Sequence, residues 1–113
     1  MNMLENLLCS KNCKENGYYI KQVVSEDIDD SNYKDFASPL RFGYINSTNK
    51  QEFITARVRT KATAFSIHTY GERDFSLDDI IRINDKFYYI EDFSVQIETR
   101  GNNKAFHYFI NLK

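Results

Sequence analysis

The chain has 113 residues, of which 42% are hydrophobic and 27% charged, a composition typical of one compact soluble domain with little room for a second. Fifteen basic residues stand against sixteen acidic ones, so the formal net charge of −1 excludes recruitment of nucleic acid or an anionic membrane by an overall positive field. Any such binding would need a local patch. The eight tyrosines and nine phenylalanines, whose rings are favoured on pleated sheets, predict a β-rich core.

The N-terminal stretch "MNMLENLLCSKNCKENG" contains an apolar run that is too short for a signal peptide or a membrane span. We therefore expect a protein that is cytosolic when made and does not contact a membrane. Met3, Leu4, Leu7 and Leu8 mark one side of a short amphipathic helix within residues 1–16. This helix could cap an open end of a β-domain or dock on a partner, and capping is the favoured interpretation.

Cys9 and Cys13 are the only cysteines, and their spacing of four places them on the same side of that helix. A zinc site needs about four ligands. The other candidates, His68 and His107, fall in separate β-patterned runs. We therefore predict two buried thiols in a reduced cytosolic protein, with no metal and no cofactor.

From Gly17 onward, apolar and polar residues alternate with the period of two that indicates β-strands. Polar turn residues separate the alternating runs, which predicts hairpin connections. We expect a small antiparallel β-barrel or sandwich of about six strands, formed by a single domain over residues 17–113. The alternating runs begin near Tyr18, Leu40, Phe53, Ala64, Ile81, Tyr88 and Ala105.

One of these runs, "QEFITARVRTK", carries Arg57, Arg59 and Lys61 on one face, with Phe53 on the same side. The basic row has two interpretations. It could line a surface or channel along which nucleic-acid phosphates pass. Alternatively, it is the solvent face of an antiparallel strand, paired with acidic residues of a neighbour, and the balanced charge of the chain favours this second interpretation.

The stretch from Phe75 to Ile97 predicts a turn followed by a hairpin. Ser76 and Asp79 have the spacing that caps a single helical turn. Asn84 and Asp85 tolerate positive φ and therefore predict a tight corner between two strands.

Within this hairpin, the apolar phase slips by one residue around Glu91 and Asp92. Such a slip predicts a β-bulge that bends the sheet toward a barrel. For the rings of the return strand, such as Phe87 and Tyr89, core burial is favoured in most cases.

Catalytic motifs are missing from the sequence: it has no Gly-rich phosphate loop, no metal-ligand set and no spaced acid pair in a recognisable context. We therefore do not expect an enzyme.

Residues 54–97, "ITARVRTKATAFSIHTYGERDFSLDDIIRINDKFYYIEDFSVQI", resemble the head-tail connector proteins of tailed bacteriophages, the head-closure (stopper) and joining proteins of the neck. The resemblance consists of a strand with alternating basic residues, a capped polar segment and the spacing D-x-I-x-x-x-x-x-x-Y-x-I across a hairpin. Four residues match that spacing: Asp79, Ile81, Tyr88 and Ile90. The corner of this hairpin departs from the pattern, because Asn84 and Asp85 stand where glycine is usual.

The resemblance implies a virion protein at the head-tail interface, present in the bacterial host cytoplasm during assembly. It implies a homo-oligomeric ring, built from subunits that can be monomeric alone, which closes the portal channel over packaged DNA. In such a ring, Phe87 and Tyr89 could contact a neighbouring subunit instead of completing the core. The implied partners are portal or adaptor ring proteins on one side, tail-completion or tail-tube proteins on the other, and the packaged DNA itself. One loop would enter the channel, and the polar segments Ser25–Ser38 and Thr69–Ser76 are both candidates.

Two alternatives belong to other functional classes. A small β-barrel could bind single-stranded nucleic acid through Arg57, Arg59 and Lys61 together with stacking rings. A small inhibitor could instead bind another protein through Leu4, Leu7 and Leu8.

Overall fold

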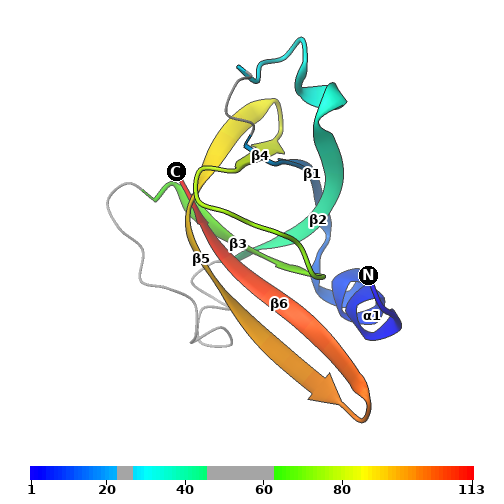
Figure 1. Cartoon of the computed structure of the whole chain (residues 1–113). Helices are drawn as coiled ribbons and strands as arrows, with labels where there is room; N and C mark the ends of the chain where they lie inside the picture. The colour runs from blue at the N-terminus through cyan, green and yellow to red at the C-terminus, as the bar shows by residue number, and fades with distance from the viewer. Residues whose placement is uncertain (23–26, 46–62) are drawn as a thin grey trace.

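The computed structural model describes residues 1–22, 27–45 and 63–113. The six strands of these residues form a closed antiparallel barrel in the order β1-β2-β3-β6-β5-β4 (Figure 1). The sequence predicts a small antiparallel barrel or sandwich with a short N-terminal helix. The structure has the barrel, so this fold class is confirmed. In chain order the elements are α1 (Met3–Asn12), β1 (Glu15–Ile20), the 3-10 helix η1 (Tyr33–Asp35), β2 (Ala37–Ile45), β3 (Phe65–Tyr70), β4 (Ile80–Ile83), β5 (Lys86–Arg100) and β6 (Asn103–Leu112).

A bulge in the long strand β5 lets the sheet bend into a barrel. Ile90 pairs with Leu112 and Asp92 pairs with Asn111, so Glu91 is the extra residue. The predicted bulge is therefore confirmed. Because a bulge bends its strand and increases the local twist, the first part of β5 can pair with β4 while the rest pairs with β6.

The corner between β4 and β5 has the two-residue geometry that the sequence predicts. Asn84 and Asp85 have φ angles of 49° and 68°. Positive φ at both central residues is the requirement of a type I′ hairpin turn, which asparagine and aspartate meet without glycine. The β5–β6 corner instead uses Gly101, with φ of 61°.

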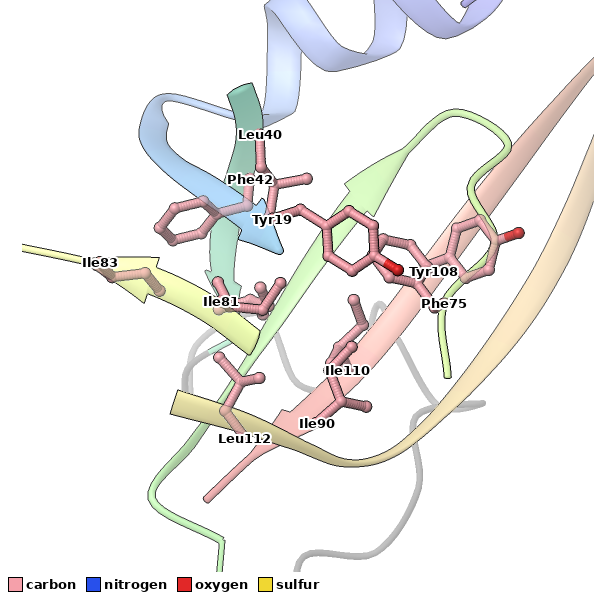
Figure 2. Close-up of a cluster of buried hydrophobic side chains, with 11 residues drawn as sticks. Tyr19, Leu40, Phe42, Phe75, Ile81, Ile83, Ile90, Tyr108, Ile110 and Leu112 are labelled. Atoms are coloured by element: carbon pink, nitrogen blue, oxygen red, sulfur yellow. The ribbon is translucent and has the colours of Figure 1, made fainter. Parts of the chain in front are cut away.

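Alternating residues of all six strands fill the barrel with apolar side chains. The rings of Tyr19 and Phe75 meet edge to face, with centroids 5.0 Å apart, and Phe75 and Tyr108 do the same at 4.8 Å. Edge-to-face pairs add to the gain from burying the rings. Figure 2 shows the members of this core, which are Tyr19, Leu40, Phe42, Ile67, Phe75, Ile81, Ile83, Ile90, Tyr108, Ile110 and Leu112.

Helix α1 is fixed to the barrel at both its polar start and its apolar side. Asn2 and Glu5 form a capping box, and the Glu5 carboxylate also accepts a 2.8 Å hydrogen bond from the backbone N–H of Phe106. Leu4, Leu8 and the two thiols pack against Tyr70 and Ala105. The helix thus covers part of the outer wall formed by β3 and β6.

The boundary between helix and barrel lies earlier than the expected residue 16, because α1 ends at Asn12 and β1 begins at Glu15.

Gly43 of β2 permits the close approach of the helix end. A Cβ atom at this position would lie 2.8 Å from the Asn12 carbonyl oxygen and 2.5 Å from Nε2 of His68. Both distances are shorter than packing allows, so the contact depends on glycine.

Candidate interaction surfaces

The basic row predicted to meet nucleic acid, Arg57, Arg59 and Lys61 with Phe53, lies outside the described residues. For the two candidate channel loops, residues 27–38 of the first and all of Thr69–Ser76 are described. In the described part of the chain, no helix combines the length and the apolar character needed to cross a membrane.

The three leucines predicted to dock on a partner differ in their surroundings. Leu4 and Leu8 are buried against the barrel wall, whereas Leu7 is 61% exposed. Docking through all three side chains would require α1 to leave the barrel. In the folded chain only Leu7 is available on that side, next to the exposed Met3.

We expect Leu8→Ala to lower the free energy of unfolding by about 3 kcal/mol, because the substitution leaves a cavity between α1 and the β3–β6 wall. Leu7→Ala, its matched control, should change stability by less than about 0.5 kcal/mol because the side chain is exposed. Urea unfolding followed by circular dichroism compares the two. Equal losses would contradict the packing of the helix described above.

Beyond the barrel, β5 and β6 continue as a projecting hairpin, here called the arm (Figure 1). β4 pairs with Lys86–Tyr89 of β5, and β3 pairs with His107–Leu112 of β6, so both strands run on past these ladders. Val95 and Ile97 pair with Tyr108 and Phe106, and they extend the inward-facing row of the barrel. They are nevertheless 47% and 52% exposed. Val95, Ile97 and the half-buried Phe106 form the arm patch.

A second exposed apolar surface lies on the outer wall of the barrel, over β1, β4 and β5. Tyr18 and Tyr89 are 42% and 43% exposed, and Phe87 beside them is half-buried. These three rings form the wall patch. Of the two interpretations of Phe87 and Tyr89, core burial is therefore wrong for Tyr89, while Phe87 packs on the outer cluster of Ile20, Tyr33 and Ile80.

Arg82 gives the wall patch a fixed centre. Its guanidinium lies 4.0 Å from the ring centroid of Tyr33 and 4.7 Å from that of Phe87. Its nitrogens also contact the carboxylates of Asp30 at 2.5 Å and Asp85 at 3.3 Å. Stacking between two rings suits the planar guanidinium, so this side chain is held in one orientation.

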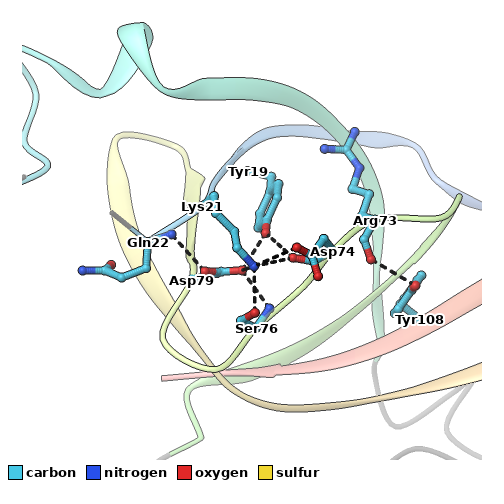
Figure 3. Close-up of polar contacts among 8 residues, drawn as sticks. All are labelled: Tyr19, Lys21, Gln22, Arg73, Asp74, Ser76, Asp79 and Tyr108. Atoms are coloured by element: carbon cyan, nitrogen blue, oxygen red, sulfur yellow. Dashed lines mark hydrogen bonds and ion pairs between the residues drawn. The ribbon is translucent and has the colours of Figure 1, made fainter. Parts of the chain in front are cut away.

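The loop before β4 is attached to the barrel by the buried carboxylate of Asp79 (Figure 3). The Tyr19 hydroxyl donates to Oδ2 at 2.5 Å, the Ser76 N–H donates to the same oxygen at 2.8 Å, and the Gln22 N–H donates to Oδ1 at 2.9 Å. Lys21 Nζ lies 3.5 Å away. Burial, followed by the hydrogen bond to Asp79, raises the pKa of Tyr19 well above its ordinary value.

The predicted helical turn between Ser76 and Asp79 is not formed. The segment is a tight turn in which Asp78 has φ of 68°, and the Asp79 side chain accepts from the backbone of Ser76. Earlier in the same loop, Arg73 donates to the Ser38 hydroxyl and the Pro39 carbonyl, and its own carbonyl accepts from Tyr108. The candidate channel loop Thr69–Ser76 is therefore bound to the barrel at both ends.

His68 and His107, which the sequence places in separate runs, meet because β3 pairs with β6. His68 Nδ1 and His107 Nε2 are 2.9 Å apart, and the Tyr70 ring stacks on His107 with centroids separated by 3.9 Å. Burial lowers the pKa of His68 to about 4 and, with the neighbouring imidazole, that of His107 to about 3. At neutral pH the pair is uncharged.

The predicted burial of the two thiols is confirmed: Cys9 and Cys13 are free and buried beside this pair. Burial, with the adjacent Cys9, raises the pKa of the Cys13 thiol to about 12, so the sulfur is protonated and poorly nucleophilic at neutral pH. Among the residues with described positions, no three His, Cys, Asp or Glu side chains are grouped so that they could hold a metal ion.

No protein-family model, curated protein or solved structure matches the chain. The fold and the surfaces define its class: a small closed β-barrel with a projecting arm and two separate exposed apolar patches.

Proposed function

We propose that this chain is a structural component of a tailed-phage neck, which closes the portal channel over packaged DNA and joins head to tail. The observation that carries the proposal is the arm, a paired hairpin that extends from a closed barrel and exposes Val95 and Ile97. A contiguous patch of exposed apolar side chains often marks a site of interaction with another protein.

The buried polar groups support a structural role rather than catalysis. The Asp79 carboxylate is occupied by donors from Tyr19, Gln22 and Ser76, which attach a loop to the barrel. The two histidines bond to each other beneath α1. Each cluster therefore has a role in holding elements together, and neither needs a substrate to complete it.

On this proposal, copies of the chain assemble into a ring between a portal or adaptor protein and a tail-completion or tail-tube protein. The protein resides in the host cytoplasm during assembly and then at the head-tail interface of the virion. Arg57, Arg59 and Lys61 are the proposed contacts with packaged DNA.

The test is deletion of the reading frame from the phage or prophage that encodes it, followed by electron microscopy of the lysate. We expect heads that packaged DNA and then lost it, beside finished free tails, and we expect a plasmid copy of the gene to restore infectious particles. Infectious particles with normal necks from the deletion would contradict the proposal. Salt-dependent binding of single-stranded nucleic acid, with Arg57→Ala and Arg59→Ala as the paired substitution, would then be the next measurement.

A further inference from the structure

We infer that the arm patch of one copy packs on the wall patch of the next copy, so that the chain associates head to tail with itself. The inference rests on the proposed function for its closure into a ring, and it names the two surfaces that make the subunit contact.

The arm patch has the character of the buried centre of an interface. Val95 and Ile97 stand two residues apart on the same strand face, and Phe106 lies opposite Ile97 on β6. Their row continues the barrel core, where Phe75, Phe93 and Tyr108 pack their rings together. The patch is therefore held on a paired, hydrogen-bonded hairpin, and little ordering is needed when a partner binds.

The wall patch consists of tyrosine and phenylalanine rings, and aromatic residues are enriched at the buried centres of protein interfaces. Tyr18 packs edge to face on Tyr33 with centroids 5.9 Å apart, and Tyr33 in turn contacts Arg82. The exposed ring of Tyr18 is thus supported from beneath. A partner with aliphatic side chains, such as valine and isoleucine, suits such a ring surface.

Charge favours this pairing of the two patches. Between Glu98 and Lys104, the tip of the arm carries two cations and one carboxylate. Segment 27–36, which covers the wall through Ile28 and Tyr33, and residues 82–86 of the β4–β5 hairpin carry an excess of acids. Five carboxylates, Asp27, Asp29, Asp30, Asp35 and Asp85, stand there against three cations, Lys34, Arg82 and Lys86. A basic arm tip and an acidic wall attract each other.

The patches are far apart on the molecule, which measures 43 × 31 × 22 Å. Figure 1 shows the arm tip at one end, and β4 with segment 27–36 at the other. One chain therefore cannot bring its own two patches together. Contact between different patches of two copies is heterologous, and such contacts close into a ring when the rotation between subunits allows it.

Sedimentation velocity of purified protein tests the inference with two complementary variants. Val95→Thr with Ile97→Thr removes the arm patch, and Tyr18→Thr with Tyr89→Thr removes the wall patch, in each case with a residue that suits strands. We expect wild type to associate beyond the dimer as its concentration rises. Each variant alone should associate at least about tenfold more weakly. Their mixture should form a one-to-one dimer and stop there, because only one intact contact is possible.

Two further variants guard against misinterpretation. Met3→Ser with Leu7→Ser removes exposed apolar side chains from α1 and should associate like wild type. Arg100→Glu with Lys104→Glu leaves both patches intact but should weaken association, with the loss reduced at high salt. This charge variant keeps the test decisive if a threonine variant fails to fold.

Several outcomes would overturn the inference: wild type that stays monomeric at the highest concentration it reaches, a wall variant that dimerises alone as tightly as wild type, or a mixture that shows no dimer. The deletion experiment is independent of these. If the deletion gives defective necks but the purified protein does not associate head to tail, the proposed function is supported and this contact is wrong. If the purified protein associates head to tail but the deletion gives normal necks, the contact is supported and the proposed function is wrong.

Discussion

Asp79→Asn should lower the free energy of unfolding by about 3 kcal/mol. The carboxylate is fully buried and accepts hydrogen bonds on both oxygens. An asparagine oxygen can replace one acceptor, but its amide N–H2 then points toward the Ser76 N–H, which loses its partner. Buried donors that lose their acceptors account for most of the expected loss.

The matched control is Asp74→Asn, the same chemical change on a neighbouring carboxylate. Asp74 lies 3.5 Å from the same Lys21 but is almost fully exposed to solvent, so we expect a change below about 0.5 kcal/mol. Urea unfolding with a common slope gives both values. If the two substitutions cost the same, Asp79 does not hold the loop to β1 as described.

Acidification should destabilise the fold through the histidine pair. The folded-state pKa values, about 4 for His68 and about 3 for His107, lie below the ordinary 6.5 because burial disfavours the charged ring. Between pH 6.5 and 4, the two histidines are therefore protonated in the unfolded chain but mostly neutral in the folded chain. The contribution of the neutral pair to the free energy of unfolding is fully present above pH 6.5 and is lost as the pH drops toward 4. The loss between pH 7 and 5 is up to about 2 kcal/mol per histidine.

Thermal unfolding at a series of pH values from 7 to 5 measures this loss, and the range stays above the titration of most carboxylates. The slope should correspond to nearly two protons taken up on unfolding in wild type and nearly one in His107→Phe. The phenylalanine keeps a ring on Tyr70, and the slope is informative even though the variant is less stable overall. Identical slopes in the two proteins would show that His107 is not the group responsible.

Features of this fold that depend only on residues adjacent in the sequence were predictable from the sequence. The corner at Asn84 and Asp85 follows from the backbone preferences of two adjacent residues. The bulge at Glu91 follows from a slip in alternation within a single strand. In both cases the physical cause lies within a few positions of the residue concerned, so the pattern contains the whole argument.

Contacts between distant segments were not predictable in the same way. Asp79 matches a local capping pattern with Ser76, yet its decisive partners, Tyr19 and Gln22, are 60 and 57 residues away. The two histidines meet only through the register of β3 against β6. The burial of Leu4 and Leu8 likewise requires the wall that contains Ala105. The alternation of residues does not give the order of the strands in the barrel. It therefore cannot predict which outward-facing side chains of the strands become buried under other segments.

The attachment of α1 also determines when the chain can finish folding. Glu5 bonds to the backbone of Phe106, which lies 101 residues later, and Asn2 bonds to the carbonyl of Lys104. During translation the first helix therefore leaves the ribosome roughly 5–20 s before the strand that receives it. In that interval Leu4 and Leu8 are exposed, and the nascent chain is open to chaperones and to aggregation until β6 emerges. Because α1 packs on β6, the last strand, and β3 also pairs with β6, we expect slow folding dominated by sequence-distant contacts.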